Sequence, residues 1–316
     1  MKRALVIGDV MLDKYIETEP VRISDEAPVL IVKETEVKYI LGGAGNIAAN
    51  LKAMGFDVTL QGIVGADETG YIVKKLLEEK QIVDAVVEEV DFKTTVKKRI
   101  LCKGRQIIRV DSEHLAIPIN PLLDEKVDAI VVSDYLKGVV GEETVRILRE
   151  NYDVPIIING KPKNIKYYMG ADVVVFNKKE ANEVLDYLRS TYNPEPTYAD
   201  IAGYFNILYV IVTKGEEGIE AYDSKELRYK VDAEDVEAKD ITGAGDTVTA
   251  ALALEILRTG DIGKAIKLAN TAGAIKVTKN KTAEVSLEEL NINPDDEGRL
   301  STEQQLDKFK ESRLDG

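Results

Sequence analysis

The hydrophobic and polar positions along most of the chain follow two alternating patterns. Short apolar runs of the length of a buried strand are followed by longer segments with an apolar residue every three or four positions, the spacing of a helix packed on one face. The predicted strands are 4–7, 58–64, 129–132, 155–158, 172–176 and 209–212. The predicted helices are 70–80, 142–151, 181–190 and 247–257. Alternating strands and helices predict an α/β fold, a doubly wound and mainly parallel sheet with helices on both faces.

Two stretches interrupt this alternation with charged and apolar residues at every second position, which is typical of half-exposed antiparallel strands. They span about residues 12–38 and 92–112. We interpret them as a small β-sheet lid on a main unit of residues 1–290. Residues 291–316 form a polar tail, and the amphipathic segment that Ser301 opens predicts a terminal helix.

The turn from Asp240 to Asp246 leads straight into the predicted helix 247–257. Gly243 and Gly245 allow a close approach to the backbone, and the free N–H groups of a helix N-terminus attract anions. Asp246 adds a carboxylate at the rim, where it can accept a proton from an alcohol that attacks a phosphoryl group. Taken alone, the motif is more often a glycine turn followed by an Asp helix cap.

A second glycine-rich turn, Gly42-Gly-Ala-Gly-Asn46, also leads from a strand into a helix. The run from Gly43 to Ala48 superficially fits the dinucleotide-binding fingerprint, which would indicate a dehydrogenase. That fingerprint belongs to the turn after the first strand, and this turn lies later. The alternative is a site where a small ligand approaches the backbone and Asn46 donates and accepts hydrogen bonds.

Polar side chains stand where the predicted strands end. They are Asp9, Asp134, Asn159, Asn177 and Thr213. Ligands of open α/β sheets bind outside the carboxyl ends of the strands, so this clustering indicates a site. Asp and Asn also serve there as ordinary turn and cap residues.

Composition narrows the class of protein. A formal net charge of −14 argues against nucleic acid as a partner. The apolar stretches are too short to span a bilayer, and the single Cys102 fits a reducing compartment, so we expect a cytoplasmic protein with no membrane segment. The single His114 nearly excludes histidine triads and zinc sites, which leaves carboxylates, Lys/Arg and backbone groups for catalysis.

The two glycine motifs, about two hundred residues apart, resemble the two signatures of the ribokinase-like (PfkB) sugar kinases. Four further stretches resemble the branch that phosphorylates D-glycero-β-D-manno-heptose 7-phosphate in ADP-heptose synthesis: 8–13, 22–28, 106–111 and 133–138. Asn159 stands where that branch usually has an Asp. That branch is often fused to a nucleotidyltransferase, and residues 300–316 resemble the helix that opens this second domain.

The resemblance implies a kinase that uses ATP and Mg²⁺. Asp246 would be the base, and the N–H groups of Gly243, Ala244 and Gly245 would hold the transferred phosphoryl group. The implied sugar-binding positions are Asp13, Gly42, Gly43 and Asn46, and Asp134 is a further candidate for substrate binding. The implied nucleotide-binding positions are Asn177, Lys178, Lys179, Glu180, Thr213, Gly215 and Asn270. Glu180 would reach Mg²⁺ through water, Asp240 matches the region of a K⁺ site in some members, and a homodimer through the lids is common in the family.

A substrate that already carries a phosphate needs basic groups at the far end of the cleft. The candidates are Arg99, Arg105 and Lys97 on the lid, and Lys137 close to Asp134 at a strand end. Charged residues on a half-exposed sheet are more often simply exposed to solvent on its outer face, without a binding role. A kinase of ribose, fructose or another phosphosugar, and a sugar sensor without turnover, remain alternative interpretations.

Overall fold

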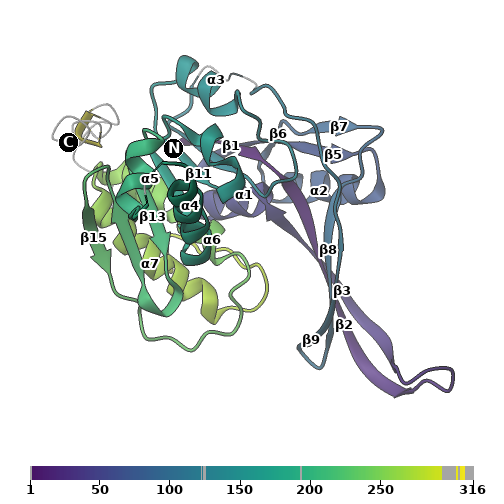
Figure 1. Ribbon diagram of the computed structural model, residues 1–316. Helices are drawn as coiled ribbons and strands as arrows, with labels where there is room; N and C mark the ends of the chain where they lie inside the picture. Colours follow the sequence, from purple (N-terminus) through teal and green to yellow (C-terminus); the bar gives the residue numbers. More distant parts are fainter. Residues whose placement is uncertain are drawn as a thin grey trace.

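A computed structural model describes residues 2–121, 123, 126–192, 194–293, 304 and 307–309. Within these residues a nine-stranded sheet forms the centre, in the order β15-β14-β13-β12-β11-β10-β1-β4-β6 (Figure 1). Its strands are β1 (Arg3–Gly8), β4 (Asp57–Gln61), β6 (Val83–Asp84), β10 (Ala129–Ser133), β11 (Ile156–Asn159), β12 (Val173–Asn177), β13 (Tyr209–Thr213), β14 (Ile219–Tyr222) and β15 (Leu227–Val231). Pairing is parallel from β6 to β13 and antiparallel at β14 and β15, which confirms the predicted mainly parallel α/β fold.

Helices cover both faces of the sheet because its inner strands are apolar on both sides. In β1, Ala4 and Val6 belong to one hydrophobic core, and Leu5 and Ile7 belong to the other. The first core also contains side chains of α1 (Ala44–Ala53), α2 (Glu68–Glu79), α6 (Ala244–Thr259) and α7 (Ile262–Thr278). The second contains side chains of α3 (Thr144–Asn151), α4 (Lys178–Thr191), α5 (Tyr198–Tyr204) and the 3₁₀ turn η1 (Pro162–Tyr168).

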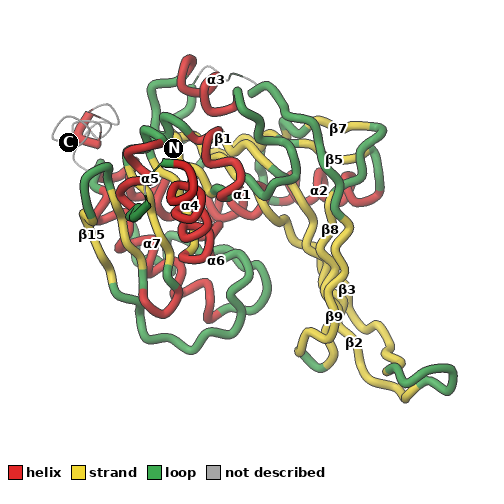
Figure 2. The backbone as a smooth tube through the Cα atoms, viewed as in Figure 1, coloured by secondary structure: helices red, strands yellow, loops and turns green. Residues whose placement is uncertain are grey.

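A separate four-stranded sheet forms the lid in the order β3-β2-β8-β9. Its strands are β2 (Val10–Ile23), β3 (Leu30–Gly43), β8 (Thr95–Cys102) and β9 (Arg105–Ser112). Figure 2 shows the β2–β3 hairpin projecting well beyond the main body. At its base, β2 passes directly from β1 after Gly8 and β3 passes directly into α1, so the lid is joined to the main sheet beside the predicted site.

The structure divides one predicted strand, residues 58–64, into two strands. Residues 58–64 contain all of β4 except its first residue and most of β5 (Ile63–Gly65), which pairs with β7 (Val87–Glu89) in a small sheet of its own. The break falls at Gly62, where a Cβ would lie 2.7 Å from the Gly8 carbonyl oxygen. The main chain therefore turns at the only residue type that this close approach allows.

Helix α7 and helix α5 were not anticipated from the pattern. Helix α7 is rich in alanine and is buried over much of its surface, so its apolar positions do not form one clear stripe. Helix α4 was predicted to begin at Ala181, but it begins three residues earlier because Asn177 caps it.

Most of the predicted terminal helix lies outside the described residues. Within the tail, Gln304 and the segment 307–309 are helical. Phe309 is buried against Tyr209, with their ring centroids 6.1 Å apart, so this part of the tail packs on the main body. None of the described helices has the length and apolar character needed to cross a membrane.

Candidate active site

The carboxylate of Asp246 is the point on which side chains from three distant elements converge. Asp246 lies in the first turn of α6 and is only 3% exposed. Its Oδ2 accepts a hydrogen bond from Asn46 Nδ2 at 2.7 Å. Its Oδ1 accepts one from Tyr135 Oη at 2.7 Å and one from Asn159 Nδ2 at 2.9 Å. The first turn of α1 and the ends of β10 and β11 therefore meet at the N-terminus of α6.

Burial raises the pKa of Asp246 to about 6, and the hydrogen bonds from Asn46 and Tyr135 act in the opposite direction. A carboxylate with a pKa near 6 is mostly ionised at neutral pH. It is also a stronger base than an exposed aspartate, so it is suited to accept a proton from a hydroxyl group.

The turn before Asp246 presents open backbone donors. Gly243 caps α6 with φ +80°, and a Cβ there would lie 2.7 Å from Asn46 Nδ2. Among the residues that the structure describes, the N–H groups of Gly243 and Gly245 have no acceptor, whereas Ala244 N–H donates to the Ile241 carbonyl at 3.2 Å. Gly245 is exposed, and no atom lies within 4 Å of where its Cβ would be. These features make an accessible anion site at a helix N-terminus.

Asn46 is held in one orientation by Asn50, which lies one turn later on α1. Asn50 Nδ2 donates to the Asn46 backbone carbonyl at 2.9 Å and to Asn46 Oδ1 at 3.2 Å. Asn50 Oδ1 in turn accepts from Thr247 Oγ1 and from the Val285 N–H, each at 3.2 Å. Because Asn46 Oδ1 is occupied, its Nδ2 points at Asp246. Asn50 was not predicted, although its spacing of four from Asn46 places both on one helix face.

Asp13 lies on β2 at the base of the lid and is 4% exposed. Its Oδ1 accepts from Arg99 Nη1 at 2.5 Å, and its Oδ2 accepts from Thr282 Oγ1 at 3.1 Å. A Cβ on Gly42 would lie 3.2 Å from Asp13 Oδ2. Gly43 has φ +57°, and its Cβ would lie 2.3 Å from the Asp9 carbonyl oxygen. Glycine at both positions thus allows β3 to pass close to Asp9 and to β2.

Tyr135 was not assigned a role from sequence, although it lies in the noted segment 133–138. Its ring has the Lys97 ammonium 5.4 Å and the Lys161 ammonium 5.0 Å from its centroid. Burial lowers the pKa of Lys97 because removal from water disfavours the charged form, and the negative charge of Asp13 offsets this only in part. In the described part of the chain no carboxylate forms an ion pair with Lys97, whereas Arg99 and Lys137 are both paired with carboxylates.

Two predicted acidic residues, Asp9 and Asp134, hold the loop that carries Tyr135. Asp9 accepts hydrogen bonds from the backbone N–H groups of Tyr135, Lys137 and Val139, and burial raises its pKa to about 6. Asp134 accepts from three donors in its surroundings: Leu136 N–H, Asn164 Nδ2 and Tyr168 Oη. Their carboxylates are engaged in positioning this loop.

The basic residues predicted for a substrate phosphate are placed differently from one another. Arg99 is buried and paired with Asp13, and Lys137 Nζ is paired with Glu113 Oε2 at 2.6 Å. In the strand register, Arg105 of β9 lies opposite Cys102 of β8 at the turn of this hairpin. Cys102 in turn lies opposite Thr18 of β2. Thr18 is five positions along β2 from Asp13, so Arg105 lies roughly 16 Å farther out on the lid at ~3.3 Å per residue.

The predicted nucleotide-binding residues lie at the ends of β12 and β13, where Asn177 and Thr213 are paired neighbours. Asn177 and Glu180 form a capping box at the start of α4, and Glu180 Oε1 also forms an ion pair with Lys161 Nζ. Gly215 follows Thr213 with φ +59° and open space beside its Cα.

The other predicted nucleotide-binding residues lie around this edge. Lys178 forms an ion pair with Glu217 at 2.5 Å, and the Lys179 side chain is 88% exposed. Asn270, on α7, donates from Nδ2 to the Asp232 carbonyl at 3.1 Å.

Asp240 is tied to the end of α7. Its Oδ1 accepts from the Thr242 N–H at 2.8 Å, its Oδ2 accepts from the Lys281 N–H at 3.0 Å, and its carbonyl oxygen accepts from Lys276 Nζ at 3.3 Å. Burial raises the pKa of Asp240, but these backbone hydrogen bonds and the nearby Lys276 charge lower it by more. Within the described residues no three His, Cys, Asp or Glu side chains form a group that could hold a metal ion.

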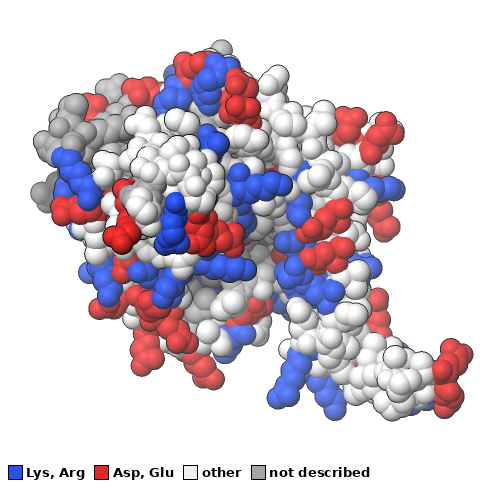
Figure 3. All heavy atoms as spheres, viewed as in Figure 1, with Lys and Arg blue, Asp and Glu red and all other residues white. Residues whose placement is uncertain are grey.

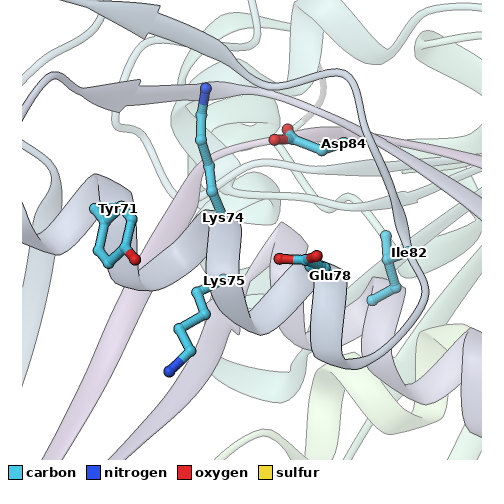
Figure 4. Close-up of a pocket in the computed structure, with 6 residues that line it drawn as sticks. All are labelled: Tyr71, Lys74, Lys75, Glu78, Ile82 and Asp84. Carbon is cyan, nitrogen blue, oxygen red and sulfur yellow. The ribbon is translucent and has the colours of Figure 1, made fainter.

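The charged surface carries no extended patch of one sign on the face shown in Figure 3, where acidic and basic side chains alternate over the main body and the lid. A separate hollow lies over α2 and β6 (Figure 4). It is lined by Tyr71, Lys74, Lys75, Glu78, Ile82 and Asp84. It shares no residue with the group around Asp246, and Lys74 and Lys75 have carboxylate partners in Glu88 and Glu79.

Comparison with known proteins places these features in context. The pfkB family of carbohydrate kinases matches residues 1–290. The chain is 36% identical over 299 residues to the bifunctional protein HldE of Campylobacter curvus, covering 90% of this chain and 64% of that protein. It is 34% identical over 297 residues to the D-beta-D-heptose 7-phosphate kinase of Bordetella bronchiseptica, covering 91% and 95%.

Among solved structures, phosphofructokinase-2 from Escherichia coli in complex with potassium has a TM-score of 0.70 to this chain at 18% identity. The similarity covers 92% of this chain and 96% of that one. At this identity the similarity shows a common fold.

Proposed function

The chain belongs to the pfkB family of carbohydrate kinases, and from this premise we propose that it transfers the γ-phosphoryl group of ATP to a hydroxyl group of a sugar phosphate. The observation that carries the proposal is the buried Asp246 carboxylate beside the open Gly243 and Gly245 N–H groups. A base and an anion site at one helix N-terminus are what phosphoryl transfer to an alcohol requires.

The sugar phosphate that we propose is D-glycero-β-D-manno-heptose 7-phosphate, converted to the 1,7-bisphosphate. The Bordetella relative is named as a heptose 7-phosphate kinase, and the chain spans nearly its whole length. The chain spans a little under two thirds of the bifunctional Campylobacter relative, so our proposal covers the kinase reaction alone.

Asp246 accepts the proton of the attacking hydroxyl as that oxygen bonds to phosphorus and ADP leaves. Asn46, Tyr135 and Asn159 hold the carboxylate in one orientation. Loss of such a base costs a factor of about 10²–10⁴ in rate. The Gly243 and Gly245 N–H groups and the dipole of α6 stabilise the negative charge that develops on the transferred phosphoryl group.

The nucleotide lies along the ends of β12 and β13 in this proposal, near Asn177, Thr213 and Gly215, with Asn270 close to the base. The exposed N-terminus of α4, with Lys178 and Lys179, adds positive potential there. Mg²⁺ neutralises phosphate charge and keeps several waters, so it needs few protein ligands. Glu180 is the carboxylate at this edge that would contact those waters.

Lys97 is the basic residue that we propose for the phosphate already present on the sugar. It lies on β8 in register with Asp13, on the same face of the lid, and its ammonium lies over the Tyr135 ring. Arg99 and Lys137 are already paired with carboxylates, and a substrate phosphate would have to compete for them.

The lids also suggest a homodimer. Apolar side chains at the outer part of the β2–β3 hairpin are exposed: Val21, Ile23, Val29 and Leu30. Exposed apolar residues on a projecting sheet are typical of a surface that pairs with another chain. We therefore propose that two copies associate through this part of the lid.

The decisive experiment is ADP release with Mg-ATP over a panel of sugars and sugar phosphates, with Asp246→Asn as the blank. The panel includes heptose 7-phosphate, fructose 6-phosphate, ribose and fructose. Turnover confined to heptose 7-phosphate supports the full proposal. Turnover on another sugar alone would keep the kinase and overturn the substrate, and Asp246→Asn with a wild-type kcat would overturn the base.

A further inference from the structure

Lys276, near the end of α7, is a lysine with no exposed surface. Its ammonium donates to the Asp240 carbonyl oxygen at 3.3 Å. Burial lowers the pKa of Lys276, whereas the negative charges of Asp240 and Asp246 favour its protonated form. Burying an ammonium group costs free energy unless nearby groups compensate its charge. The burial of Lys276 therefore indicates that this side chain has a specific role.

The surroundings of Lys276 are the start of the anion-binding turn. The N–H groups of Lys239 and Asp240 both donate to the Val277 carbonyl, at 2.7 and 3.1 Å. The Asp240 carboxylate closes the arrangement through the Thr242 and Lys281 N–H groups. The end of α7, the loop after it and the turn that leads to Gly243 are thus fastened together around Asp240, with the Lys276 ammonium inside.

A backbone carbonyl oxygen and a nearby carboxylate are oxygen ligands that suit a monovalent cation as well as an ammonium group. The fold is shared with a phosphofructokinase-2 that has been solved with potassium. In this chain a covalently attached cation already stands against the Asp240 carbonyl oxygen. The residues around Asp240 therefore do not fit a requirement for K⁺.

We propose that the Lys276 ammonium is a built-in monovalent cation that holds the Asp240–Gly245 turn in its anion-binding shape, so that phosphoryl transfer needs no added K⁺. This inference rests on the proposed kinase function. Lys276 touches neither the base nor the open N–H groups, so it is a positioning residue that acts through the backbone of Asp240.

The test compares the wild-type protein with Lys276→Ala, Lys276→Met and Lys267→Ala. Alanine leaves room for an ion, and methionine fills the space with an uncharged chain. Lys267 is an exposed lysine on the same helix and serves as the matched control. Each protein is studied in chloride salts of K⁺, methylammonium and tetramethylammonium at one ionic strength, by thermal unfolding and by ADP release.

We expect the wild-type protein and Lys267→Ala to have the same Tm and kcat in all three salts. Lys276→Ala should lose kcat by about 10²-fold in tetramethylammonium, since small displacements of catalytic groups have effects of this size. K⁺ or methylammonium should raise both its Tm and its kcat. Lys276→Met should lose kcat similarly and show no recovery.

Activation of the wild-type protein by K⁺ would overturn the proposal, as would wild-type kcat for folded Lys276→Met in tetramethylammonium. A failure of the kinase proposal itself would look different, because no sugar would then be turned over by the wild-type protein. In that case the salt dependence of Tm still decides: recovery of Lys276→Ala alone by K⁺ or methylammonium supports the built-in cation, and identical behaviour of all four proteins excludes it.

Discussion

Tyr135 donates its phenolic O–H to Oδ1 of Asp246 at 2.7 Å, and the ammonium groups of Lys97 and Lys161 lie 5.4 and 5.0 Å from the centroid of its ring. Burial and then the negative charge of Asp246 raise the pKa of Tyr135 well above its usual value. Tyr135 therefore remains a protonated donor throughout the working pH range. Its hydrogen bond stabilises the ionised carboxylate and holds the pKa of Asp246 below the value that burial alone would give.

Tyr135→Phe should move the acidic limb of the pH–rate profile to higher pH. In the proposed mechanism Asp246 accepts a proton only when it is ionised, so activity should be lost as the pH falls through its pKa of about 6. Without the phenolic donor the carboxylate is less stabilised, its pKa rises, and the loss begins at a higher pH. The measurement is kcat/KM for the sugar phosphate between about pH 5 and 8 in both proteins, a range that brackets the raised pKa of Asp246.

Tyr198→Phe is the control for this shift. Its hydroxyl group donates to Asn182 Oδ1 at 2.7 Å on the outer side of α4, away from Asp246. Tyr198→Phe should leave the acidic limb of the pH–rate profile at the same pH as in the wild-type protein. An unchanged limb in Tyr135→Phe would show that the ionisation seen in the profile is not that of Asp246.

The two glycines of the anion-binding turn should respond differently to alanine. Gly243→Ala forces a side chain into the left-handed region, at a cost of roughly 1–2 kcal/mol, and presses its Cβ against Asn46 Nδ2 and Thr282 Cγ2. It should lower both the Tm and kcat because Asn46 orients the base. Gly245→Ala meets no protein atom, so its methyl group should leave the Tm unchanged and lower kcat/KM by occupying the anion site.

Thermal unfolding and steady-state kinetics on the two variants separate these effects. A normal kcat/KM in Gly245→Ala, with an unchanged Tm, would show that the phosphoryl group does not approach this part of the turn. A stable and fully active Gly243→Ala would show that Asn46 can move without consequence for Asp246.

The sequence was sufficient to predict those elements of the fold that depend only on residues close together in the chain. The apolar run 129–132 specifies a strand without help from the rest of the chain, and this strand appears in the structure. The glycine motifs and Asp246 were found for the same reason, since a turn and a helix start are local features. The break at Gly62 was missed because it depends on contact with Gly8, which only the folded sheet brings near.

The site residues that sequence did not identify act through distant partners. Tyr135 reaches Asp246 across elements whose relative placement no local pattern specifies. Asn50 lies one turn from Asn46 on the same helix, but it also accepts hydrogen bonds from Thr247 and Val285, which are distant in the sequence. The sequence alone does not distinguish Lys276 from Lys267, and only its burial against the Asp240 carbonyl oxygen does so. Arg105 and Lys97 both lie in alternating charged and apolar sequences of the lid. Only the strand register shows that Arg105 lies at the hairpin turn and that Lys97 lies beside Asp13.

Lys97→Met should raise KM for the sugar phosphate and leave KM for ATP unchanged. The Lys97 ammonium lies at the base of the lid without a carboxylate partner in the described chain, and a hydrogen bond to a charged group contributes about 1.5–3 kcal/mol, so the increase should be roughly tenfold or more. Lys98→Met is the matched control, because the neighbouring side chain of β8 points to the opposite face of the lid. The same two variants are measured with the unphosphorylated parent sugar, on which neither should have an effect. An equal rise in KM for the phosphorylated and unphosphorylated sugars would mean that Lys97 supports Tyr135 and the cleft as a whole, and would return the phosphate-binding role to Arg99 or Lys137.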